Sequence, residues 1–189
     1  VCSSDLLAHP NVWHRRMAQR ILSGRGTTAF GPRSLRPETP VHALFKDGPT
    51  PEARLSALWT LHSMGLLEEG TLDLAAQDSD PALRAWAARL SGERGHLLKD
   101  AQVRLEKLAR DPDLTVRLGV AVAARQFVSG ALTVNTPPKV PLSEAVTGGI
   151  LRALFQSASQ GTDPTFDFLY WMAAEPLVAY DPVHAIGAY

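Results

Sequence analysis

The sequence predicts an all-α fold, an irregular right-handed α-solenoid of about four to five helix pairs. Four stretches share one pattern: a loop rich in Pro, Asp or Gly, an arginine, a small apolar residue three positions later, and a leucine-like residue six or seven positions later. A helical unit that recurs roughly every 30 to 40 residues is typical of a solenoid. No stretch combines the strict alternation of a half-buried strand with a hairpin turn. The aligned arginines are Arg15, Arg54, Arg84 and Arg117.

Several of the expected helices begin at capping side chains. Asp80, Asp163 and Thr50 each precede a proline, which fits the first helical position because its missing N–H is not needed there. Asn11 and Asp113 each follow a proline by one residue and are expected to cap two further helices.

Second helices are expected between the arginine-bearing ones, and residues 97–110 show the clearest apolar stripe, at three- and four-residue spacing. Glycines follow several of these helices and are expected to end them in the left-handed conformation, at Gly24, Gly65, Gly92 and Gly130. The expected ranges of the remaining helices are 39–46, 66–77, 97–110, 142–156 and 164–174, with a short helix from Asp181 onward.

The chain is expected to divide into four segments. Residues 1–6 (VCSSDL) look like the translation of a common sequencing adapter and are expected to be non-native, together with the one cysteine, Cys2. Residues 7–132 are expected to form the helical repeats. Residues 133–141 are expected to form a linker, because their prolines remove donors and restrict the preceding residues. Residues 142–189 are expected to form terminal helices of the same solenoid.

The charge balance argues against a nucleic-acid partner. The chain has 19 Lys and Arg against 19 Asp and Glu, with 45% hydrophobic and 20% charged residues, as in globular proteins. This balance gives no electrostatic footprint for nucleic acid or an anionic membrane. The longest apolar run, residues 120–124, is too short to span a bilayer, so no direct membrane insertion is expected.

The sequence predicts no catalytic, cofactor-binding or metal-binding residue in this segment. The six histidines form no HxxxH or HExxH pair, and neither a G-x-S-x-G elbow nor a phosphate-binding glycine loop is present. The four tryptophans do not share a repeat position, so packing in the core or at helix seams is expected rather than a stacking platform. The segment is therefore expected not to be an enzyme by itself.

An aspartate precedes the arginine by six residues in two of the four repeats, as Asp78 with Arg84 and Asp111 with Arg117. This spacing resembles the HEAT repeat. The resemblance implies a ladder of hydrogen bonds between turn aspartates and helix arginines of successive repeats, formed here by structural residues Arg54, Arg84, Arg117, Asp78 and Asp111. The first two repeats depart from this pattern, since His9 and Gly48 occupy the aspartate position.

Three strings resemble the helical-repeat portion of the PVC-type haem-binding CxxCH proteins, often labelled putative membrane-bound dehydrogenases: HPNVWHRRMAQRIL from His9, ALWTLHSMG from Ala57 and DPTFDFLYWMAAEPL from Asp163. The resemblance spans nearly all of residues 7–183. In that family a dehydrogenase-like β-propeller precedes the repeats and a c-type cytochrome domain follows them. It implies that residues 7–189 are the middle module, and that haem c belongs to a missing downstream domain.

The function expected from this resemblance is a non-catalytic scaffold that docks the propeller against the cytochrome domain in a larger exported electron-transfer protein. Its partners would be other domains of the parent chain or a separate protein, and the family resemblance implies a periplasmic or exported location. Two alternatives stay open. One is a stand-alone HEAT-like adaptor for protein–protein interaction, and the other is a bilin-lyase-like HEAT protein that binds a tetrapyrrole.

Overall fold

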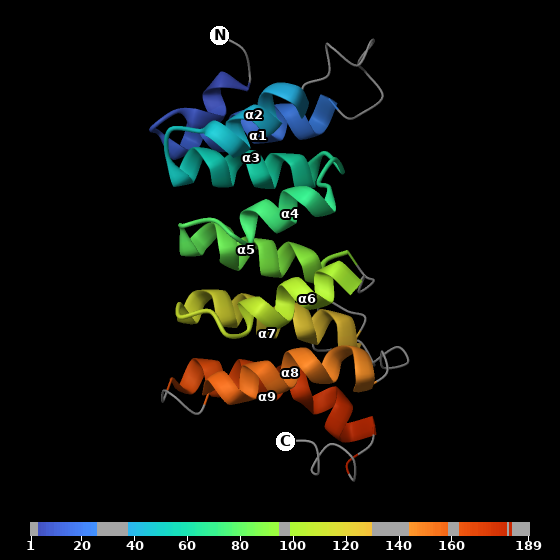
Figure 1. Ribbon diagram of the computed structural model, residues 1–189. Helices are drawn as coiled ribbons and strands as arrows, with labels where there is room; N and C mark the ends of the chain where they lie inside the picture. Colours follow the sequence, from blue (N-terminus) through green and yellow to red (C-terminus); the bar gives the residue numbers. More distant parts are fainter. Residues whose placement is uncertain are drawn as a thin grey trace. The chain divides into compact units, whose positions relative to one another are not determined.

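The computed structural model describes residues 4–25, 38–94, 99–129, 144–158, 163–180 and 182, and within these ranges the regular structure is entirely helical (Figure 1). The predicted all-α class is confirmed. The chain divides into two compact units, Val1–Thr71 and Leu72–Tyr189. The boundary falls inside helix α4 (Glu69–Ala75).

The first unit is built around helix α3 (Pro51–Ser63), which packs against helix α2 (Glu38–Asp47), helix α1 (Val12–Arg25) and the short 3-10 helix η1 (Asp5–Ala8). The small and leucine positions of the repeat pattern supply its core. The fully or almost fully buried side chains there include Leu7, Ala18, Leu22, Val41, Ala57, Leu58 and Leu61.

The second unit places alternate helices against one another. Helix α7 (Leu114–Ser129) packs against α5 (Pro81–Gly92) and against α9 (Pro164–Tyr180), while α6 (Lys99–Leu108) packs against α8 (Glu144–Ala158) (Figure 1). Helices α5, α7 and α9 thus form one series, and α6 and α8 form a second series beside it. The seam between α5 and α7 is close, since a Cβ on Gly119 would lie 2.7 Å from the Ala85 carbonyl oxygen.

All five predicted capping side chains accept helix N–H groups. Asp80 Oδ1 accepts from Ala82 and Leu83 at 2.8 and 3.4 Å, and Thr50 Oγ1 accepts from Ala53 at 3.2 Å. The remaining three caps, each with Oδ1 as acceptor, are Asn11, Asp113 and Asp163. Helix starts in this chain follow from local hydrogen bonding, as the sequence indicates.

The glycine predictions are wrong at two positions. Gly65 does take the left-handed conformation, with φ of 70°, but Gly24, in the last turn of α1, and Gly92, the last residue of α5, do not. A Cβ on Gly92 would lie 2.6 Å from the Ala123 Cα, so this glycine permits close approach of α5 and α7 and is not a left-handed cap. The fourth position, Gly130, lies outside the described residues.

The predicted second helices exist with shifted ends. The ranges 66–77 and 97–110 were too long, because α4 and α6 cover only Glu69–Ala75 and Lys99–Leu108. The range 164–174 was too short, because α9 continues through Pro176 to Tyr180. The expected linker at 133–141 lies outside the described residues, as does most of the helix expected from Asp181.

Candidate functional site

The repeated arginine clamps the turn that precedes its own helix. In three repeats, Nη1 donates to the backbone carbonyls six and five residues earlier. Arg84 Nη1 reaches Asp78 O and Ser79 O at 2.9 and 3.0 Å. The corresponding pairs are 2.8 and 2.8 Å for Arg15 and 2.7 and 3.1 Å for Arg117. The arginine position is therefore fixed by a local turn before any neighbour is considered.

The residue six before each arginine closes the same turn. Asp78 Oδ1 accepts the Asp80 N–H at 2.8 Å, and Asp111 Oδ1 accepts the Asp113 N–H at 2.9 Å. In the first repeat His9 Nδ1 accepts the Asn11 N–H at 3.0 Å. His9 therefore makes the same turn bond as the two aspartates. Its imidazole ring, however, brings no carboxylate to this position of the repeat.

Arg84 also joins two repeats of the second unit. Its Nε and Nη2 donate to Asp111 Oδ2 and Oδ1 at 2.8 and 3.0 Å, a bidentate pair from α5 to the turn before α7. The pair is largely enclosed, with 16% and 9% of the two side chains exposed. Paired geometry of this kind is among the stronger side-chain interactions in proteins.

The pair shifts the pKa of both partners. Burial opposes ionisation of Asp111, but the Arg84 hydrogen bond, the Asp113 N–H and the charges of Arg84 and Arg117 outweigh it and hold the pKa of the carboxyl below its ordinary value. The hydrogen bond to Asp111 raises the pKa of Arg84. Both groups are therefore charged at neutral pH.

The other three residues of the predicted ladder lie in different surroundings. Arg54 is half-buried in the first unit, where a Cβ on Gly48 would lie 2.9 Å from its Cγ. Asp78 is half-buried and lies in the second unit. Arg117 clamps its own turn and stacks over Phe166, with 5.6 Å between the guanidinium carbon and the ring centroid.

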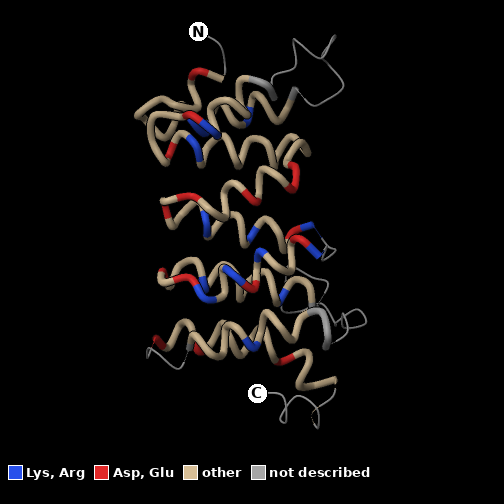
Figure 2. Tube along the Cα trace, in the orientation of Figure 1, with Lys and Arg blue, Asp and Glu red and all other residues tan. Residues whose placement is uncertain are grey.

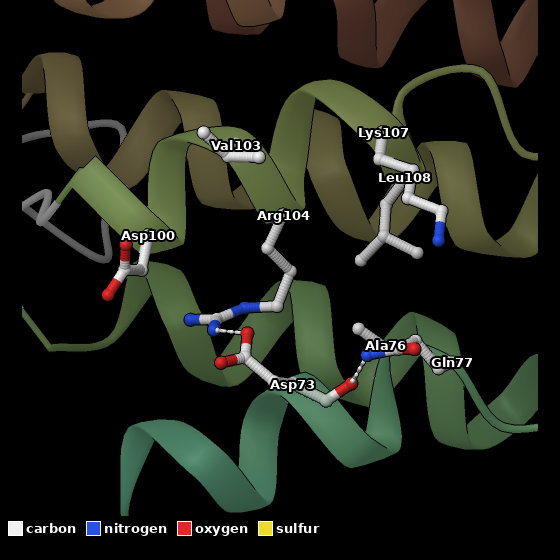
Figure 3. A pocket seen from close by; sticks show the side chains of 8 residues that line it. All are labelled: Asp73, Ala76, Gln77, Asp100, Val103, Arg104, Lys107 and Leu108. Atoms are coloured by element: carbon white, nitrogen blue, oxygen red, sulfur yellow. Dashed lines mark hydrogen bonds and ion pairs between the residues drawn. The ribbon is translucent and has the colours of Figure 1, made fainter.

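A groove of about 300 Å³ lies between α4 and α6 (Figure 3). Arg104 crosses it, pairs with Asp73 on α4, and donates from Nε and Nη2 to Ser91 Oγ at 3.2 and 3.1 Å. Only 3% of the Arg104 side chain is exposed, against 44% of Asp73. Apolar and charged side chains thus line the groove together, namely Asp73, Ala76, Gln77, Asp100, Val103, Arg104, Lys107 and Leu108.

Arg104 was missed by the sequence analysis, although the sequence carries a signal for it. It lies three residues after Ala101 and four before Leu108, and both of those side chains are buried. A charged residue on the apolar stripe of an amphipathic helix needs a partner in the interior, because an unpaired buried charge is costly.

A second open pocket, of about 620 Å³, lies where the turn before α7 meets the end of α8. Two arginines line it, Arg110 and Arg117. Arg110 is exposed and donates from Nη2 to Gln156 Oε1 at 3.3 Å. The remaining lining residues are Asp111, Pro112 and Ser157.

The W-x-x-x-E-P-L string, residues 171–177, forms a junction between α7 and α9. Pro176 lies inside α9 and cannot donate to the Met172 carbonyl, and Arg125 Nη1 donates to that oxygen instead, at 2.7 Å. The same nitrogen pairs with Glu175 Oε2 at 2.8 Å. Acidic but no basic residues lie along α9, as Figure 2 shows, so α7 supplies the counter-charge.

The prediction that the tryptophans pack in cores and seams is wrong for two of them. Trp13 is 57% exposed and Trp171 is 52% exposed, whereas Trp59 and Trp86 are half-buried. Packing was expected because the rings share no repeat position, but on α1 and α9 the packed faces are those of Ala18 and Leu22 and of Phe166 and Ala173.

Within the described ranges no three His, Cys, Asp or Glu side chains gather closely enough to hold a metal ion. No helix in this part of the chain is long and apolar enough to cross a membrane. Comparison with protein-family models, with curated proteins and with solved structures finds no match to this chain. The described part of the chain therefore belongs to the all-helical class, and the chain forms two compact units.

Proposed function

We propose that this chain is a non-catalytic, HEAT-like helical-repeat scaffold that docks other proteins or domains. The observation that carries the proposal is the recurrence of one turn geometry at Arg15, Arg84 and Arg117. A unit that repeats its hydrogen bonds as well as its sequence pattern is what stacked repeat proteins are built from, and such proteins bind partners along their extended surfaces.

The groove between α4 and α6 supports a docking role. Val103 lines it and is 60% exposed, so the groove offers an apolar side chain to a partner. Asp100 and Lys107 stand seven residues apart on α6, one near each end of the groove (Figure 3). A groove that combines an exposed apolar side chain with charges of opposite sign at its ends fits side chains of a protein partner.

The finer proposal is that the scaffold links a dehydrogenase-like β-propeller to a c-type cytochrome domain in an exported electron-transfer protein. It is supported by the resemblance of the strings starting at His9, Ala57 and Asp163 to the PVC-type family. Electron transfer would then be the activity of the parent protein, and this segment would set the distance between its redox domains.

The test begins with the genomic reading frame around residues 7–189. The domains encoded on either side are expressed separately, and their binding to this chain is measured by isothermal titration calorimetry. We expect binding that Val103→Glu weakens, while Val12→Glu, at an exposed position of the other unit, serves as the matched control. Absence of binding by every flanking domain, or equal loss with both variants, would refute docking through this groove.

The same reading frame separates this proposal from the stand-alone adaptor. A frame that contains a propeller upstream and a CxxCH motif downstream supports the linking role. A frame that lacks both excludes that role and leaves the adaptor, whose partner would be a separate protein.

A further inference from the structure

The guanidinium group of the repeated arginine can bind two partners at once, one through Nη1 and the other through Nε and Nη2. In Arg84 the Nη1 edge holds the carbonyls of its own turn, and the Nε–Nη2 edge holds the carboxylate of Asp111 from the following repeat. In Arg117 the Nη1 edge makes the same two bonds. Its Nε, however, is buried and has no hydrogen-bond partner in the described part of the chain.

The sequence differs at the position that would supply a carboxylate to Arg117. Helix α9 packs on α7 as α7 packs on α5, so the residues just before Asp163 correspond in sequence to those around Asp111. Asp111 stands two residues before its cap, Asp113. Two residues before the α9 cap, Asp163, the sequence has Gly161, which has no side chain to offer.

The space beside Arg117 is open and positively charged. The pocket of about 620 Å³ next to it is lined by a second arginine, Arg110, which is exposed. The one acidic lining residue, Asp111, already pairs with Arg84. The Ser157 hydroxyl donates to the carbonyls of Ala109 and Ala153, at 2.7 and 2.8 Å, so it is not a donor for a ligand. The charged donors that line the pocket are therefore those of the two arginines, with the Gln156 amide beside them.

We propose that this pocket receives a carboxylate side chain, Asp or Glu, from a partner protein, and that Arg110 and Arg117 hold it as Arg84 holds Asp111. Arg110 is exposed and Arg117 is half-buried, so the carboxylate meets Arg110 first and completes its contacts on Arg117. Two guanidinium groups that line one pocket suit a planar carboxylate through paired hydrogen bonds. The inference rests on the docking function proposed above, because a partner supplies the carboxylate.

A short peptide tests the pocket without knowledge of the partner. The probe is acetyl-Asp-Pro-Asp-Leu-amide, the sequence of residues 111–114, whose first carboxylate is the one that Arg84 binds within the chain. The control probe has asparagine in place of both aspartates. Both are titrated into the full chain and followed by amide chemical shifts, and we expect the aspartate peptide to bind at least about tenfold more tightly.

Variants assign the binding to this pocket. Arg110→Ala and Arg117→Lys are expected to weaken binding of the aspartate peptide by roughly tenfold, a loss of about one charged contact. Arg20→Ala removes the same charge from an exposed position of the other unit and is expected to leave binding unchanged. Arg110 is exposed, so Arg110→Ala keeps the test valid even where Arg117→Lys lowers stability. Equal binding of both peptides, or no effect of Arg110→Ala, overturns the proposal.

Competition identifies the anion. N-acetylalanine presents a main-chain carboxylate, and inorganic phosphate presents a different anion. Displacement of the peptide by either one at equal concentration would show a general anion site and overturn the assignment to an Asp or Glu side chain. The peptide assay also stands apart from the domain titrations. Peptide binding without domain binding would support the carboxylate pocket and refute the docking function. Domain binding without peptide binding would support the docking function and refute the carboxylate pocket.

Discussion

Replacing Arg84 by alanine tests whether the pair with Asp111 holds two repeats together. The substitution removes two charge-assisted hydrogen bonds to the carboxylate and two bonds to the carbonyls of Asp78 and Ser79. It also leaves Asp111, 9% exposed, without its counter-charge.

The magnitude follows from these losses. Hydrogen bonds to charged groups contribute about 1.5–3 kcal/mol, and stranding one partner of a buried pair costs about 3–5 kcal/mol. Arg84 keeps 16% of its side chain exposed, which places the expected loss near the lower value, about 3 kcal/mol. For a chain of this length each kcal/mol corresponds to roughly 2–4 °C, so the melting temperature should fall by about 6–12 °C.

The assay is urea unfolding followed by tryptophan fluorescence in a background with Trp13→Phe and Trp59→Phe. The remaining tryptophans, Trp86 and Trp171, both belong to the second unit, so the signal reports that unit. Arg152→Ala, in the second unit and exposed, is the matched control and should change stability by no more than about 0.5 kcal/mol.

A double-mutant cycle isolates the pair. Arg84→Ala combined with Asp111→Ala should be less destabilising than the sum of the single variants, with a coupling of about 1–3 kcal/mol. Additive effects, or equal stability of Arg84→Ala and Arg152→Ala, would refute the reasoning that this contact joins the repeats.

Three further predictions concern the second unit. Gly119→Ala should destabilise it by about 1–3 kcal/mol in urea unfolding, since a Cβ there would lie 2.7 Å from the Ala85 carbonyl oxygen and force α5 and α7 apart; an unchanged midpoint would contradict this. Arg125→Ala should cost about 1–2 kcal/mol, and clearly less in a Pro176→Ala background, because residue 176 then donates to the Met172 oxygen itself. The depressed pKa of Asp111 gives stability that is complete above about pH 4 and is lost as pH falls through the lower folded-state pKa, so Asp111→Asn should flatten the acid limb of a stability–pH curve; equal slopes would contradict it.

Helix starts could be predicted from the sequence because they depend on neighbouring residues alone. Thr50, Asp80 and Asp163 each cap the helix that begins at the following proline. Helix ends could not be predicted in the same way. Gly92 shows why: its missing side chain serves the contact with Ala123 on α7, which is distant in sequence, and a glycine gives the same local signal for a cap or for a close approach.

In the candidate sites, too, the sequence indicates a residue's local role but not its partner on another helix. Pairing of Arg84 with Asp111 was expected only through the resemblance to HEAT repeats, because the six-residue spacing of Asp78 and Arg84 says nothing about the next repeat. The Arg104 pair with Asp73 had a signal, a charge within an apolar stripe, but its partner lies on α4, a separate helix. The sequence placed the charge and left its partner undetermined.

The two edges of the guanidinium group explain why the arginine recurs even where a ladder cannot form. Gly48 stands at the aspartate position in the turn before α3, and Gly161 stands at the same position before α9, so neither Arg15 nor Arg117 can receive that carboxylate. Both nevertheless hold their own turns through Nη1. The local clamp is therefore sufficient reason for the arginine in these repeats, and the contact between repeats is an addition that Asp111 makes on Arg84. An arginine that keeps the clamp without that addition retains a donor edge, and this edge is what a partner's carboxylate would use at Arg117.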